Sequence, residues 1–162
     1  MDEKKNQIIK ESFYIDVKNM MRGIKAEKEG DYETAYTCFK QAADAGNPVA
    51  AFFIGNMYYF GEYGAHELFV FDRAISPYDS FTQTKPDYVK AFEWFIKAAE
   101  DGYPDAMKNI GIMYYLGRGV ESDDEAAKRW LTKAANIGVK RVEQILAELF
   151  ESDDACHSQS KV

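Results

Sequence analysis

The stretch AFEWFIKAAEDGYPDAMKNIGIMYYLGRGVESDDEAAKRWLTKAANIG, residues 91–138, decides the fold because it contains one pattern twice. Small and apolar residues return after 36 positions: Ala91, Phe95, Ala98, Ala99 and Gly102 recur as Ala127, Leu131, Ala134, Ala135 and Gly138. A third copy lies 56 positions earlier: Ala35, Phe39, Ala42, Ala43, Gly46 and Pro48 match Ala91, Phe95, Ala98, Ala99, Gly102 and Pro104. Self-similarity at a period of roughly 20–50 residues is typical of repeat proteins. The sequence therefore predicts stacked helix pairs, with an insertion of 20 residues in the middle unit.

Residues at equivalent places in the repeats predict where the helices begin and end. The second helix of each pair is expected to begin after a capping aspartate and to end at a left-handed glycine. The aspartates are Asp31, Asp87 and Asp123, and the glycines are Gly46, Gly102 and Gly138. Proline suits the first position of a helix, so Pro48 and Pro104 begin the helices expected over 48–60 and 104–116. Ser122 and Glu125 have the spacing of a capping box.

Both ends of the chain are expected to add one helix each. The first helix is predicted from Ser12 to about Glu29, after a polar and frayed segment over residues 1–10. Its apolar face is expected to carry Phe13, Val17, Met20, Met21 and Ile24. A last helix over about 139–150 is expected to cap the stack with Val142, Ile145, Leu146, Leu149 and Phe150. The prediction is one domain over residues 1–150, with an insertion at about 62–84 and a disordered tail over 151–162.

Two glycines near the middle of predicted helices indicate close packing. Gly55 and Gly111 stand at the same phase of the repeat. A glycine inside a helix costs about 1 kcal/mol relative to alanine, so its repetition needs a reason. We expect a neighbouring helix to approach closely at both positions.

Composition limits the classes of partner and site. The chain has 20 basic and 27 acidic side chains, a net charge of −7. Nucleic acids and anionic membranes attract positive charge, so neither is an expected partner, whereas a basic protein is compatible. The cysteines Cys38 and Cys156 give no disulfide framework, and together with His66 and His157 they give no metal-ligand spacing. The absence of a signal peptide and of a membrane-spanning run predicts a cytosolic protein.

One repeat carries enough specific positions to resemble a known family. Its positions are Ala106, Ile110, Gly111, Tyr114, Gly117, Gly119 and Val120, then Asp124, Ala127, Trp130, Lys133, Ala134, Ala135 and Gly138. This frame closely resembles the Sel-one-like repeat, a branch of the tetratricopeptide superfamily, and the resemblance spans most of 48–138. Residues 16–46 look more like a plain tetratricopeptide unit, although Arg22 and Ala26 replace an expected apolar and an expected aromatic residue. The resemblance implies an all-α, right-handed α-solenoid of about three and a half helix-turn-helix pairs with one inserted loop.

The resemblance also implies a binding surface, because in such folds the first helix of each pair lines a concave face. Carried over by phase, the residues of that face are Met20, Ile24, Phe52, Asn56, Tyr59, Phe60, Lys108, Ile112, Tyr115, Arg141 and Gln144. The alternative is that Phe52, Tyr59, Ile112 and Tyr115 belong to the core between helices. Asn56 and Lys108 are more informative, since a polar side chain in an aromatic row has little reason to be buried.

The insertion between Gly61 and Lys85 is too apolar for a solvated linker. It contains Phe69, Phe71 and Tyr78 among other apolar residues. Long loops in compact domains are usually functional or disordered. One interpretation is a lid that packs on its own repeat, and the other is a protrusion that binds a partner through these aromatic residues.

These observations predict a non-catalytic protein-binding module without cofactor or metal. No phosphate-binding loop, nucleophile elbow or Cys–His pair is found, and no catalytic residue is proposed. The principal hypothesis is a cytosolic adaptor or scaffold that binds through the concave face and the insertion. The alternative is a dedicated inhibitor, such as a bacterial immunity protein that neutralises a basic toxin. A hydrolase is the remote third hypothesis, because some secreted relatives are linked to β-lactam binding, but the paired cysteines of that group are missing here.

Overall fold

The computed structural model describes residues 2–61 and 86–151, with the backbone alone for residues 2–14 and 151. Seven α-helices follow one another: α1 (Asp2–Lys28), α2 (Tyr32–Asp44), α3 (Pro48–Phe60), α4 (Tyr88–Glu100), α5 (Pro104–Leu116), α6 (Asp124–Asn136) and α7 (Val142–Leu146). A π-helical turn, Ala147–Glu151, continues α7. No β-strand occurs in these ranges, so the prediction of an all-α fold is confirmed.

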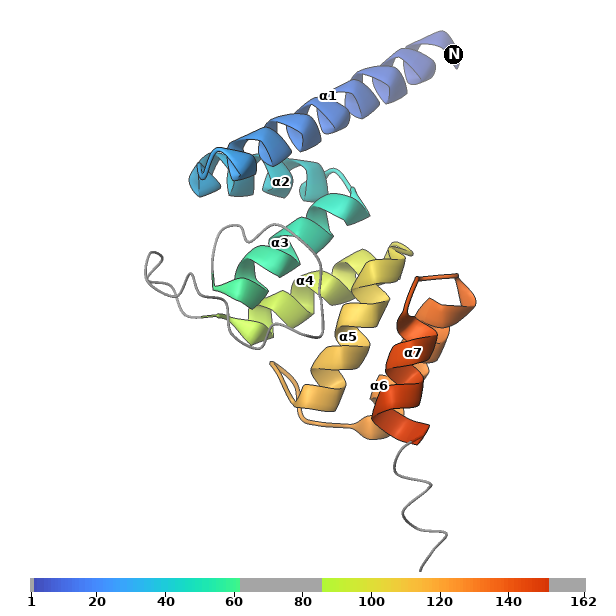
Figure 1. Ribbon diagram of the computed structural model, residues 1–162. Helices are drawn as coiled ribbons and strands as arrows, with labels where there is room; N and C mark the ends of the chain where they lie inside the picture. Colours follow the sequence, from blue (N-terminus) through green and yellow to red (C-terminus); the bar gives the residue numbers. More distant parts are fainter. Residues whose placement is uncertain (1, 62–85, 152–162) are drawn as a thin grey trace, which may run out of the picture.

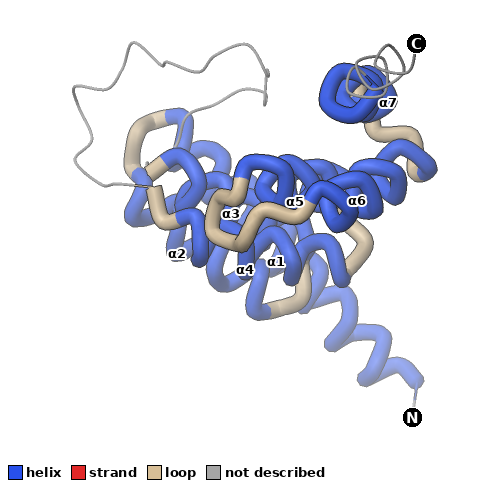
Figure 2. The backbone as a smooth tube through the Cα atoms, turned by 90° about the horizontal axis from the view of Figure 1, so that it is seen from below, coloured by secondary structure: helices blue, strands red, loops and turns tan. Residues whose placement is uncertain are grey.

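The helices form a stack in which contacts run mainly between neighbours along the chain. The most extensive contacts lie within the pairs α1–α2, α3–α4 and α5–α6, and smaller contacts join each pair to the next. Figure 1 shows this order from α1 at the top to α7 at the lower right, and Figure 2 shows the stack from below. This is the arrangement of a solenoid, in which each repeat contacts only its neighbours. The three and a half helix pairs expected from the sequence are present.

The helix ends lie where the repeated residues predict them. Each second helix has an aspartate N-cap whose side chain accepts a backbone N–H at 2.9–3.1 Å: Asp31, Asp87 and Asp123. Each second helix is followed by a glycine with φ between 85° and 93°: Gly46, Gly102 and Gly138. These left-handed glycines end the helices, and Pro48 and Pro104 are the first residues of α3 and α5.

Every helix pair contains a glycine that faces a bulky side chain of the partner helix. The pairs are Gly23–Phe39, Gly55–Phe95 and Gly111–Leu131. A Cβ atom added to these glycines would lie 2.6–2.7 Å from the facing side chain, much closer than van der Waals contact. Phe39, Phe95 and Leu131 are fully buried, so they have no free space to move into. The close approach predicted at Gly55 and Gly111 is confirmed, and it also occurs at Gly23.

The first helix differs from its prediction in its start. α1 begins at Asp2, so the prediction of a frayed segment over residues 1–10 is wrong. The physical reason lies in the residues themselves. This segment contains three lysines, one glutamate and one glutamine, which have high helix propensity. Asp2 and Glu3 also stand at the positive end of the helix dipole, where negative charge is stabilising.

The apolar face predicted for α1 is only partly buried. Met20 and Ile24 pack against the core, as expected. Val17 and Met21, in contrast, are 39% and 69% exposed, and this part of the prediction is wrong. In the described part of the chain the main contacts of α1 are with α2, and they leave these two side chains exposed.

The end of the stack confirms one prediction and corrects two. Val142 and Leu149 are buried and their apolar neighbours pack against the same core, so the last turns cap the stack as predicted. However, α7 begins at Val142 rather than at residue 139. The capping box predicted for Ser122 is also wrong, because Asp123 is the N-cap of α6 and the Ser122 hydroxyl donates to the Tyr115 carbonyl at 3.3 Å. Predictions about residues 62–84 and the tail fall outside the described residues.

Candidate protein-binding surface

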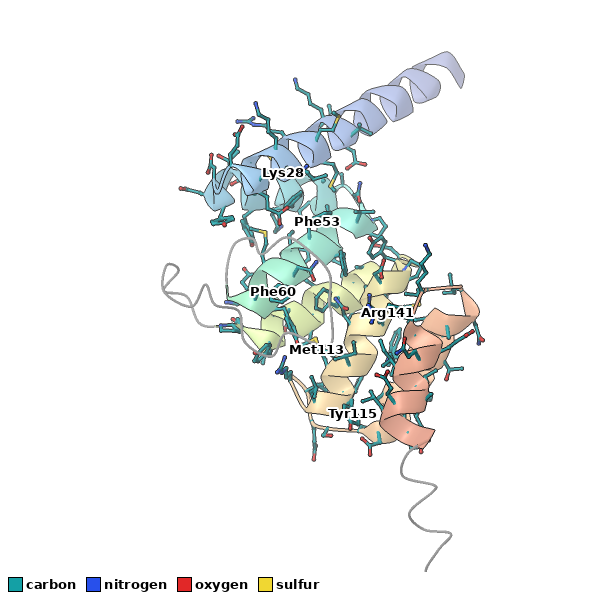
Figure 3. The ribbon with its side chains drawn as sticks, in the orientation of Figure 1. Lys28, Phe53, Phe60, Met113, Tyr115 and Arg141 are labelled. Atoms are coloured by element: carbon teal, nitrogen blue, oxygen red, sulfur yellow. The ribbon has the colours of Figure 1, made fainter. Side chains whose placement is uncertain are left out.

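A pocket of about 510 Å³ lies between the beginning of α5 and the beginning of α7. Three segments line it: the first turn of α5, the connection from α6, and one face of α7 with its π-helical continuation. The lining residues are Pro104, Asp105, Lys108, Ile137, Gly138, Val139, Lys140, Arg141, Gln144, Ile145 and Glu148. Figure 3 shows Arg141 near the start of both helices. The pocket therefore lies between α5 and α7, each of which is the first helix of its pair.

The connection between α6 and α7 explains why the pocket forms here. α3 and α5 begin two residues after the helix-ending glycine, whereas α7 begins four residues after Gly138. The bond from the Val139 N–H to the Ala134 carbonyl, 3.2 Å, repeats those from Asn47 to Ala42 and from Tyr103 to Ala98, but no proline follows it. Arg141 then takes a left-handed conformation with φ of 67°, which is uncommon outside glycine. The wider turn holds the first residues of α7 away from α5.

The polar groups of the pocket carry both signs of charge. The Lys108 ammonium lies 2.9 Å from an Asp105 carboxylate oxygen, and its side chain is only 17% exposed. On the facing helix, the Gln144 amide donates to the Glu148 carboxylate at 2.7 Å. Arg141 is exposed at the rim. The pocket thus offers fixed donors and acceptors for the polar groups of a ligand, rather than one sign of charge.

The first turn of α5 adds further hydrogen-bond donors beside the pocket. At the equivalent place in α3, the Asn47 side chain accepts the N–H groups of Val49 and Ala50 at 2.9 and 3.1 Å. In α5 the N-cap is Tyr103, which makes no side-chain capping bond. Its ring packs on Phe52 instead, with ring centroids 4.8 Å apart, and burial raises the pKa of the Tyr103 hydroxyl. The amides of the first turn of α5 therefore lack the capping bond that the N-cap side chain supplies in α3.

Several residues predicted for the concave face belong to the core. Tyr59 and Ile112 are 5% and 2% exposed, so their assignment to a binding surface is wrong. Met20, Ile24 and Phe52 are half-buried and pack against the core. Phe52 and Tyr59 are covered by their own partner helix and by the following repeat, since both rings contact Phe95 and they also meet Tyr103 and Arg118, respectively.

Tyr59 is held in the core by an arginine from the next repeat. The Arg118 guanidinium donates to the Tyr59 hydroxyl at 2.5 Å. It also lies over two rings, 5.6 Å from the centroid of Tyr59 and 5.3 Å from that of Tyr88. Burial raises the pKa of the Tyr59 hydroxyl, and the hydrogen bond from Arg118 opposes that rise. Tyr59 is therefore a structural contact between repeats.

The remaining predicted residues lie outside the pocket or outside the described residues. Asn56 is half-buried on α3, and Phe60 is 39% exposed at its end. Tyr115 lies edge-on against Phe150, with ring centroids 5.6 Å apart. Figure 3 shows Phe60 and Tyr115 at the ends of α3 and α5, away from Arg141. The predicted insertion residues lie among those the structure does not describe: Phe69, Phe71 and Tyr78.

Three of the predicted residues come together at the pocket: Lys108, Arg141 and Gln144. Matching the repeats by helical phase did not predict the other charged residues that line the pocket, namely Asp105, Lys140 and Glu148. The signal that could have found them is the lack of a proline after Gly138, since it predicts a longer turn at this junction. None of the helices in the described ranges has the length and apolar character needed to cross a bilayer.

The chain matches a family model described as Sel1 repeat. It matches residues 20–47, 48–67, 80–103 and 104–139, more than half of the chain. Among curated proteins, the ERAD-associated E3 ubiquitin-protein ligase component HRD3B of Arabidopsis thaliana is 31% identical over 117 residues, which is 65% of this chain and 19% of that protein. The chitin synthase regulator SKT5 of Saccharomyces cerevisiae is 38% identical over 55 residues, or 34% of this chain and 8% of that protein. The chain thus spans a fifth or less of the length of these relatives.

Solved structures show the same architecture. A Sel1 repeat protein from Oxalobacter formigenes superposes with a TM-score of 0.62 and 27% identity, over 81% of this chain and 34% of that one. The protective antigen c5321 of uropathogenic Escherichia coli, described as having an SLR fold, gives a TM-score of 0.66 with 24% identity over 88% of this chain and 26% of that one. Because the E. coli antigen is only 24% identical, its likeness to this chain concerns the fold alone.

Proposed function

Because the chain belongs to the Sel1 repeat family, we propose that it binds a partner protein through the pocket between α5 and α7, as a non-catalytic adaptor. Proteins built from Sel1 repeats generally mediate protein–protein interactions, and they are generally not catalysts. The names of the two curated relatives, a ligase component and a synthase regulator, are compatible with a chain that acts by binding.

The observation that carries this proposal is the convergence of three predicted residues on one pocket. Lys108, Arg141 and Gln144 come from different helices and turns and line the same pocket of about 510 Å³. Ligand pockets typically measure about 300–1,000 Å³, so this one has room for a few side chains of an extended segment. Donors from Lys108, Arg141 and the first turn of α5 suit the carbonyl oxygens of such a segment.

The partner is proposed to be basic overall and cytosolic. The net charge of −7 attracts a basic protein over a distance, which makes association depend on salt. The free and buried Cys38 is compatible with a reducing compartment. A steep loss of association rate with rising salt supports a basic partner, and a rate independent of salt contradicts it.

The pocket is tested by filling it. Gln144→Trp places a large side chain on the lining of α7, and Glu143→Trp places the same side chain on an exposed neighbour that does not line the pocket. A library of random displayed peptides is selected against the wild-type protein, and the recovered peptides are measured against both variants. We expect the first variant to weaken binding by about tenfold or more and the second to leave it unchanged. Equal binding by both variants contradicts the pocket.

The insertion is proposed as a second contributor to binding. Replacing residues 62–84 by the short connection that follows Gly117 should leave a folded protein, because the flanking helices contact each other directly. Any peptide or protein that contacts the insertion should then bind the shortened protein more weakly than the wild type. Unaltered binding of every selected partner contradicts this role.

A further inference from the structure

The register of the repeats identifies a face of α1 that differs from its counterparts. A displacement of 32 residues carries Gly23 onto Gly55, and a further 56 carries it onto Gly111. These glycines have the same packing role, so the other residues of α1, α3 and α5 can be matched in the same way. Lys18, Arg22 and Lys25 then correspond to Ala50, Ile54 and Met57 of α3, and to Ala106, Ile110 and Met113 of α5.

The counterparts of the three basic residues are buried. All six side chains in α3 and α5 are between 0% and 4% exposed. All six belong to the core of the stack, and each of these first helices contacts the second helix of the preceding pair. The stacked rings of Phe39 in α2 and Phe53 in α3, with centroids 4.8 Å apart, mark this contact. The structure therefore uses this side of a first helix as a docking face for another helix.

On α1 the same side is exposed, basic and partly apolar. Lys18, Arg22 and Lys25 are all exposed. Met21, the counterpart of Phe53, is 69% exposed, and Ile15, on the same helix, is 57% exposed. We call these five residues the outer face of α1. Three cations, flanked by two large exposed apolar side chains, thus share one side of a helix on a chain whose net charge is −7.

In the described part of the chain, the acidic neighbours of these cations are themselves exposed: Arg22 interacts with the charge of Asp31, and Lys25 with that of Glu29. Lys25 lies 3.8 Å from Glu29, with side chains that are 76% and 62% exposed. Ion pairs this exposed contribute little, about 0–1 kcal/mol at most. A partner that brings carboxylates to this face would therefore find cations available for pairing.

We propose that the outer face of α1 docks an acidic amphipathic helix of a partner protein. The first helices α3 and α5 contact the preceding helices α2 and α4, respectively. By analogy, the segment of the partner that binds the outer face of α1 should be a helix. The three cations specify its charge, and Met21 and Ile15 are its apolar contacts. This surface is separate from the pocket between α5 and α7, so the two proposals stand or fall independently.

The test uses the full chain and a synthetic probe. The probe is a helical peptide of about 20 residues, long enough to form helix, with a leucine stripe flanked by glutamates. A control peptide has lysines in place of the glutamates. Binding is measured by fluorescence anisotropy at about 0.15 M salt, where long-range attraction is largely screened.

A matched pair of variants separates the face from net charge. Lys18→Glu with Arg22→Glu reverses two cations four residues apart on α1. Arg129→Glu with Lys133→Glu reverses two exposed cations at the same spacing on α6, so both proteins have the same net charge. We expect the α1 variant to weaken binding of the acidic peptide by about tenfold or more, and the α6 variant by less than about twofold. Met21→Ala should weaken it by an intermediate factor.

Other outcomes overturn the proposal. An acidic peptide that does not bind, or binds no better than the lysine control, means that the face is only a solvated polar end of the solenoid. If both double variants lose affinity for the acidic peptide equally, the peptide is attracted by the overall charge of the protein rather than by the outer face of α1. Oligomers that form with rising protein concentration and disappear in the α1 variant identify a second copy as the occupant. Binding to vesicles of anionic phospholipid without binding to the peptide identifies a lipid surface instead.

Discussion

The substitution Gly111→Leu tests the packing that holds each helix pair together. A Cβ atom at this position would lie 2.7 Å from Leu131 Cγ, 3.1 Å from Leu131 Cδ2 and 3.2 Å from the Ala127 carbonyl oxygen. Leu131 and Ala127 are both fully buried, so neither can turn toward solvent. A leucine adds three further carbons in the same direction. The helices α5 and α6 must therefore move apart.

The expected loss follows from two opposing terms. Overpacking a buried contact costs about 1–3 kcal/mol, and leucine belongs at the upper end because even its Cβ does not fit. Removing a glycine from a helix interior offsets about 1 kcal/mol of this. The free energy of unfolding should thus fall by about 2 kcal/mol, which lowers the melting temperature by roughly 4–8 °C for a domain of this size.

Thermal and urea unfolding, followed by circular dichroism, measure this loss. The control is Thr132→Leu, which adds a similar side chain at an exposed position of the same helix pair. Leu131→Ala should recover part of the loss when it is combined with Gly111→Leu, giving a coupling energy of about 1 kcal/mol or more. An unchanged melting temperature, or strict additivity in the double variant, would refute the close-packing argument.

Three further predictions concern single polar groups. Asn109 is 1% exposed, and neither polar atom of its side-chain amide has a hydrogen-bond partner among the described residues. Asn109→Leu should therefore raise the free energy of unfolding, measured by urea titration, by about 1–3 kcal/mol. A variant that is less stable than the wild type contradicts this. Asp123→Ala removes an N-cap and should cost about 0.5–2 kcal/mol, whereas Asp124→Ala, one residue later, should cost clearly less; equal losses argue against capping. The hydrogen bond from the Lys90 N–H lowers the pKa of Asp87, so its stabilising effect is present above the ordinary value of 3.8 and is lost as the pH falls through the folded pKa. Asp87→Asn keeps an acceptor without the titration, so its melting temperature should fall less than that of the wild type below pH 4 or so; parallel curves contradict the assignment.

Most of the fold could be predicted because repetition makes local signals reinforce one another. Gly102 alone is a weak signal for the end of a helix, and Pro104 alone is a weak signal for the start of one. The same pair at Gly46 and Pro48 makes a helix boundary clear. The start of α1 could not be read in this way, because no second copy of residues 1–10 exists. The start of α7 was missed for a related reason, since Gly138 is not followed by proline and the turn is longer there.

The candidate site was predicted less well, because helical phase does not fix burial. Tyr59 and Tyr115 have the same phase, but Arg118 draws Tyr59 into the core while Tyr115 lies against Phe150. Such contacts come from residues distant in sequence, which a periodic pattern cannot reveal. The pocket residue Lys140 was missed because a turn replaces the beginning of the helix expected over about 139–150, so helical phase does not apply there.

The position of Arg118 has a consequence for protein engineering. Tyr59 and Tyr88, the two rings that it joins, stand just before and just after the insertion. The Asp87 N–H also bonds to the Tyr58 carbonyl at 2.9 Å, so the two stems of the insertion are fastened together below it. Each doubling of a loop closed in this way costs only about 0.6 kcal/mol of chain entropy. We therefore expect that peptides of other lengths can be grafted in place of residues 62–84 while α3 and α4 keep their contacts.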